Sequence, residues 1–205
     1  MSPYDVKRER KELYAPKNTA WALIEVPEQQ FIAIDGQGDP NTSPAYAAAV
    51  EALYTVAYTL KFAAKRDGRD FVVAPLEGLW WADDYEAFTV RAKASWKWTM
   101  LISLPDWITK ETIEEARAAA AAKKKLPAIA DIRHHTLHEG LCAQVLHVGS
   151  YDDEAPLLAH LHNDYVKANG LRLHGLHHEI YLSDPRRTRP EKLKTILRQP
   201  VRPSE

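Results

Sequence analysis

The chain contains a single cysteine, Cys142, among 205 residues. One cysteine cannot form an intramolecular disulfide or a thiolate metal cluster, so the disulfide-stabilised secreted class is excluded. Apolar runs of membrane-spanning length are also lacking, and residues 1–12 are charged rather than apolar, unlike a signal peptide. We therefore predict a soluble protein in a reducing compartment, the cytoplasm.

Strong net charge is lacking as well. The 27 basic and 28 acidic side chains leave a formal charge of 27 minus 28, or -1. No strong field therefore recruits nucleic acid or an anionic membrane, and neither is expected as a partner. What the chain does have is aromatic surface, with six Trp and nine Tyr. Aromatic rings stack on flat apolar ligands, so planar aromatic or cationic small molecules are the expected partners.

Residues 175–183 alternate as a half-buried strand does. The alternation places His177, Glu179 and Tyr181 on one face, and Ile180 and Leu182 on the other. A carboxylate in the middle of a strand has a partner, has a raised pKa, or binds a cationic or polarised ligand. An exposed Glu on a solvated sheet face is the open alternative.

A second carboxylate, Glu77, interrupts the β-rich run 71–81, which ends in Trp80 and Trp81. Pro75 has no N–H to donate to a strand ladder. This strand is therefore expected to lie at the edge of a sheet or to have a bulge at Pro75. The run 96–104 also alternates and places Trp98 on its apolar face, which is equally typical of an ordinary core strand.

Helices are predicted after Ser43, after Thr109 and across 152–169, each from its capping residues and apolar spacing. Tyr54 stands beside the apolar stripe of the first helix, where packing is the more common role. The expected fold is α+β. It has two βαββ modules related by a pseudo-two-fold, with antiparallel sheets, helices on one face, and a ligand cleft between modules that both carboxylates could approach. The predicted divisions are a surface arm at 1–20, a first module with its connecting helix at 21–126, and a second module at 127–205.

The sequence gives weaker evidence for metal, serine or cysteine chemistry. The candidate metal-binding pairs His134–His135, His160–His162 and His177–His178 lack the i, i+4 spacing of a zinc helix. No G-x-S-x-G elbow is present, and Cys142 lies in a strand pattern typical of a small core residue. We predict neither a metal nor an organic cofactor. A carboxylate among aromatic rings remains, either as a general base or as the anchor of a planar cation.

Three segments carry a family resemblance: 75–80 (PLEGLW), 139–154 (EGLCAQVLHVGSYDDE), and 178–184 (HEIYLSD) with 191–195 (EKLKT). They resemble the GyrI-like small-molecule-binding domains and, more narrowly, the stand-alone branch that includes cyclopropanoid cyclopropyl hydrolases. The resemblance runs from about residue 11 onward. It implies two βαββ modules that line a cleft for flat, aromatic or cationic compounds, with Glu179 matching the Glu at the cleft floor.

The resemblance also implies detoxification, in which water opens the cyclopropane of a DNA-alkylating compound. Glu179 would activate the water with help from Glu77, and Tyr181 or Tyr151 would stabilise the developing negative oxygen. A non-catalytic multidrug-binding or sequestering module is the alternative, and a protein-binding module is a third. The sequence leaves open a monomer or a dimer. The predicted ligand contacts are Trp80, Trp81, Trp98, Tyr54, Tyr151 and His177.

Overall fold

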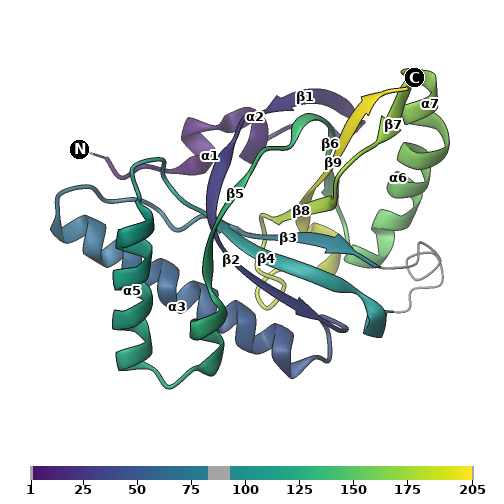
Figure 1. The fold of residues 1–205 in the computed structure, drawn as a ribbon. Coiled ribbons are helices and arrows are strands. Elements are labelled where there is room, and N and C mark those ends of the chain that lie inside the picture. The colour runs from purple at the N-terminus through teal and green to yellow at the C-terminus, as the bar shows by residue number, and fades with distance from the viewer. Residues whose placement is uncertain (1, 83–92, 205) are drawn as a thin grey trace. The chain divides into compact units, whose positions relative to one another are not determined.

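The computed structural model describes residues 2–82 and 93–204 (Figure 1). The chain divides into two compact units. Unit 1 comprises Met1–Glu9 and Gln29–Leu137, and unit 2 comprises Arg10–Glu28 and His138–Glu205. Within the described ranges, no helix combines the length and the apolar character needed to traverse a bilayer. Mixed helices and antiparallel strands in both units confirm the α+β class.

The sheet of unit 1 has the strand order β3 (Leu76–Trp81), β4 (Lys97–Ser103), β2 (Gln29–Gln37), β5 (Arg133–Leu137). All of these neighbours pair antiparallel. The predicted strand 71–81 is too long: β3 begins only after Pro75, because proline has no N–H to donate to the ladder. Phe71 instead forms an isolated bridge with Tyr4.

Two helices of unit 1 begin at the predicted caps. The Ser43 hydroxyl accepts from the Tyr46 N–H and starts α3 (Pro44–Arg66), and Thr109 caps α5 (Lys110–Lys123) in the same way. α3 packs on β2 and β4 through a fully buried stripe that includes Leu53 and Leu60, and α5 lies against α3 (Figure 1). The shorter elements are α1 (Val6–Glu9), η1 (Lys93–Ser95) and η2 (Pro127–Asp131).

The sheet of unit 2 has the strand order β1 (Ala22–Val26), β6 (Gly140–Val148), β9 (Lys194–Pro203), β8 (His177–Tyr181), and β7 (Leu171–Leu173) pairs with the far end of β9. Its helical segment runs through η3 (Tyr151–Glu154), α6 (Ala155–His160), the π-helical η4 (Leu161–Tyr165) and α7 (Val166–Ala168). Leu161 and Val166 pack on Val145 and Leu197 of the sheet. A further 3₁₀ turn, η5 (Pro190–Lys192), precedes β9.

The first 28 residues are divided differently from the predicted arm and modules. β1 pairs with β6, so it belongs with residues 138–205 rather than with the strand that follows it in the chain. The predicted surface arm is also partly core, since α2 (Lys11–Tyr14) buries Leu13 and buries Tyr14 completely. Both units show the order strand, helix, strand, strand, whereas a pseudo-two-fold between them stays a prediction.

Candidate functional site

β8 has two different faces, as its alternation predicts. His178 and Ile180 are fully buried on one face, while His177, Glu179 and Tyr181 are half-buried on the other. Glu179 pairs with Leu197 of β9, and residues paired across antiparallel strands point to the same side. Leu197 packs against Leu161 of the helical segment of unit 2. Glu179 therefore lies on the face of the unit 2 sheet that this helical segment covers.

The carboxylate of Glu179 accepts one hydrogen bond on each oxygen. The Tyr181 hydroxyl donates to Oε2 at 2.7 Å, and His177 Nε2 lies 3.2 Å from Oε1. The side chains of His177 and Glu179 are 17% and 16% exposed, so the group is reachable but largely removed from solvent. An oriented, partly desolvated carboxylate of this kind can accept a proton or hold a cation.

Tyr151, just after β6, reaches the same cluster. Its ring meets the Tyr181 ring edge to face, with centroids 5.8 Å apart and planes at 84°. Burial raises the pKa of Tyr151 to about 12, and the charges of Glu179, Glu154 and Asp184 add to the shift. The phenol therefore keeps its proton at neutral pH and can donate a hydrogen bond.

His162 contributes from the π-helical segment η4. Burial lowers the pKa of His162, and electrostatic interaction with the nearby His177 imidazole lowers it further. π-helical turns inside α-helices are frequent at functional sites because they redirect a side chain. The Glu179 face is thus bordered by groups from β8, η3 and η4.

A buried ionic network lies on the opposite face of β8, and sequence reasoning missed it. Glu139 Oε1 accepts from His178 Nδ1 and Oε2 from Arg198, both at 3.0 Å, and these side chains are at most 3% exposed. Arg198 also donates to Gln144 and to the Leu13 carbonyl, both at 2.9 Å. The available signal was an arginine in the middle of the predicted strand 195–201.

That network determines the charge of Glu139. Burial by itself would raise the pKa of Glu139, but the charges and hydrogen bonds of His178 and Arg198 lower it from 4.5 to about 2. The ionised carboxylate therefore stays buried with its partners at any physiological pH. It ties residues 10–14 to the strand that carries Glu179.

The other predicted site residues lie in unit 1. Glu77 is fully buried in β3, and strand alternation places Trp81 on its side of the sheet. Trp80 faces the other way, where it stacks on Tyr46 of α3 with centroids 6.3 Å apart. Trp98 is opposite Trp80, is 1% exposed and meets the same Tyr46 edge to face. Both Trp80 and Trp98 therefore pack in the core beneath α3.

Tyr54 belongs to an aromatic row on α3. Its ring lies 6.4 Å from that of Tyr58, which lies 6.3 Å from that of Phe62. Tyr58 and Phe62 are 47% and 53% exposed, while Tyr54 is partly buried at the end of the row. The ligand roles predicted for the unit 1 side chains stay predictions.

Metal binding and thiol chemistry would each depend on other side chains. In the described part of the chain, no three His, Cys, Asp or Glu side chains are grouped to hold a metal ion. Cys142 is fully buried, and burial, followed by the charge of Glu139, raises the pKa of its thiol. The thiol is thus protonated at neutral pH and unsuited to nucleophilic attack.

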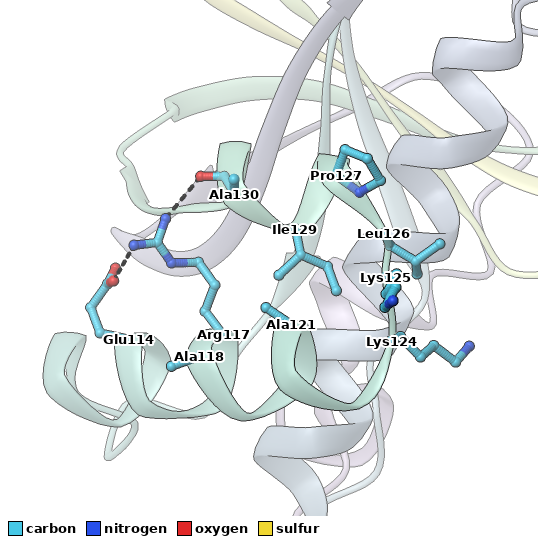
Figure 2. Close-up of a pocket in the computed structure, with 10 residues that line it drawn as sticks. All are labelled: Glu114, Arg117, Ala118, Ala121, Lys124, Lys125, Leu126, Pro127, Ile129 and Ala130. Carbon is cyan, nitrogen blue, oxygen red and sulfur yellow. Dashed lines mark hydrogen bonds and ion pairs between the residues drawn. The ribbon is translucent and has the colours of Figure 1, made fainter.

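A groove of about 670 Å³ lies between α5 and η2 in unit 1 (Figure 2). Figure 2 shows Arg117 spanning it, bonded to Glu114 and to the Ala130 carbonyl. Lys124, at its other end, pairs with Glu51. Its floor is of small apolar side chains such as Ala121, and none of the predicted site residues lines it. Its lining carboxylate, Glu114, is paired with Arg117, and its lining residues include no aromatic ring, so the groove does not fit the predicted chemistry.

Comparison with known proteins agrees with this fold. An uncharacterised conserved protein from Listeria innocua is 41% identical, with a TM-score of 0.90 over 97% of this chain and all of that one. A hydrolase from Listeria innocua is also 41% identical (TM-score 0.85, 97% and 100% covered), and another is 39% identical (TM-score 0.86, 98% and 100% covered). No curated protein is significantly similar. The family model of the GyrI-like small molecule binding domain matches residues 21–202, and the chain therefore belongs to the GyrI-like family of small-molecule-binding domains.

Proposed function

We propose that this protein binds flat electrophilic small molecules at the Glu179 face of unit 2 and hydrolyses cyclopropane-bearing, DNA-alkylating compounds. The observation that carries the proposal is the half-buried Glu179 carboxylate, which Tyr181 and His177 orient by hydrogen bonds. The identity of about 40% to two hydrolases supports turnover rather than binding alone. The cytoplasm is the proposed location, because a detoxifying enzyme acts before the compound reaches DNA.

In the proposed reaction, Glu179 takes a proton from water, and the water oxygen forms a bond to the methylene carbon of the cyclopropane. The ring C–C bond breaks, and its electron pair moves through the conjugated system to the carbonyl oxygen. That oxygen takes up a proton from solvent and ends as a phenol, and Glu179 returns its proton to solvent. Tyr151 is the proposed hydrogen-bond donor to that oxygen, since its raised pKa means that the phenol keeps its own proton. Tyr181 is less suited to this role because its proton is directed at Glu179.

The test is incubation with a cyclopropanoid alkylator, followed by mass detection of a product heavier by one water. We expect product with the wild type and with Glu191→Gln, an exposed control in the same unit. Glu179→Gln keeps the shape of the side chain but cannot accept the proton, so its turnover should be lost. Equal turnover by Glu179→Gln and the wild type would remove Glu179 from the mechanism.

A second candidate is binding of planar cations without turnover. Three carboxylates, Glu179, Glu154 and Asp184, lie close enough to Tyr151 to raise its pKa, and an aromatic ring beside negative charge suits a cation. This candidate expects saturable heat of binding for a planar cation in calorimetry, weakened by Glu179→Gln. It also expects no hydrated product from the alkylator with the wild type, an outcome opposite to that of the hydrolase.

A further inference from the structure

His177 and Tyr181 lie on either side of Glu179 along β8. Side chains two residues apart in a strand share a face and are separated by about 6.6 Å, so both neighbours can reach the carboxylate between them. Tyr181 takes one oxygen and His177 the other. Each carboxylate oxygen has two lone pairs, so one on each remains for a water or a substrate.

The tautomer of His177 follows from this contact. An ionised carboxylate can only accept, so the proton between the two groups belongs to Nε2 of His177. In the neutral imidazole Nδ1 is then the acceptor. Of the titratable side chains in unit 2, Glu179 faces His177 from its own strand and His162 from η4.

We propose that His177 is a positioning residue that fixes the Glu179 carboxylate through an Nε2–H donor, rather than a contact for the ligand. This inference rests on the proposed hydrolase function. The hydrogen bond from His177 prevents rotation of the carboxylate about its terminal bond, so that the remaining lone pairs stay aimed at the water. Losing it lowers the rate of the chemical step and leaves substrate affinity unchanged.

The experiment compares three histidine variants with the cyclopropanoid alkylator as substrate. His177→Leu removes the donor, and kcat should fall by at least about tenfold with KM unchanged. His177→Gln supplies a neutral N–H donor and should recover most of kcat. His174→Leu, an exposed histidine preceding the same strand, should behave as the wild type. If KM rises while kcat is kept, or if the Gln and Leu variants lose kcat equally, His177 is not a positioning residue.

A second measurement does not depend on turnover. Long-range ¹H–¹⁵N spectra of the imidazoles should show His177 with its proton on Nε2 at neutral pH, and a proton on Nδ1 alone would overturn the inference. Glu179→Gln separates the two proposals. If that variant keeps full turnover, the hydrolase mechanism fails, whereas loss in Glu179→Gln with full kcat in His177→Leu overturns only the role of His177.

Discussion

The Tyr181 hydroxyl donates a 2.7 Å hydrogen bond to Oε2 of Glu179, two residues earlier on the same strand. The sequence suggested Tyr181 as a donor to the substrate oxygen. In the structure the Tyr181 hydroxyl donates to Glu179, the proposed base, and the Tyr151 ring of η3 meets the Tyr181 ring edge to face. In the proposed mechanism we therefore assign Tyr181 to orienting Glu179, and Tyr151 to donating a hydrogen bond to the ligand.

Removing the Tyr181 hydroxyl should slow hydrolysis without unfolding unit 2. A hydrogen bond to a charged group contributes about 1.5–3 kcal/mol, so Tyr181→Phe should lower kcat/KM by roughly ten- to a hundredfold. Steady-state kinetics with the alkylator would measure this. Tyr58→Phe, an exposed tyrosine of unit 1, is the control. Full activity in Tyr181→Phe would show that Glu179 does not need this donor.

Tyr151 should titrate above an ordinary tyrosine. Its pKa is raised to about 12, first by burial and then by the negative charge of Glu179. Glu179→Gln removes that charge, so the pKa of Tyr151 should fall in the variant while staying above 10. NMR of ¹³Cζ-labelled tyrosine across alkaline pH would follow it. An unchanged titration in Glu179→Gln would mean that the phenol and the carboxylate are not close.

Glu139 should make stability depend on acid pH. Its folded pKa of about 2 lies below the ordinary 4.5, so its contribution is present above pH 4.5 and is lost as the pH falls toward 2. The contribution is on the order of 3 kcal/mol. Glu139→Gln breaks a buried pair, so it should cost about 3–5 kcal/mol at pH 7 and much less near pH 2. Urea unfolding at several pH values, with exposed Glu191→Gln as control, would test this. If the free energy of unfolding changed with pH equally in the wild type and in Glu139→Gln, this prediction would be contradicted.

Gly36 should not tolerate a side chain. It lies opposite Trp98 in the β2–β4 ladder, and a Cβ there would come within 2.1 Å of the indole ring. Gly36→Ala should therefore cost about 1–3 kcal/mol in thermal unfolding, since buried Trp98 has little room to move. In a Trp98→Phe background the same change should cost less. Equal costs in both backgrounds would show that the indole is not the obstacle.

Local signals in the sequence were sufficient for most elements. Ser43 and Thr109 begin helices where their hydroxyls can cap them, and Gly170, with φ of +63°, follows the helical segment of unit 2 as predicted. The pairing of β1 with β6 was not predicted, because it joins residues far apart in the chain and strand periodicity carries no information about the partner. Alternation left open whether Trp98 packs in the core or contacts a ligand, and its burial against Tyr46 depends on α3, a distant segment of the chain.

The sequence by itself determined that His177, Glu179 and Tyr181 share one face of a strand, because alternation is a property of the extended backbone. It also carried the motifs of the GyrI-like family. Only the tertiary structure decided what each group meets: the Tyr151 ring against the Tyr181 ring, His162 close enough to His177 for its pKa to be affected, and Glu139 paired with Arg198 behind the strand. These contacts join separate segments, so they arise from packing and hydrogen bonding across the folded unit rather than from local pattern.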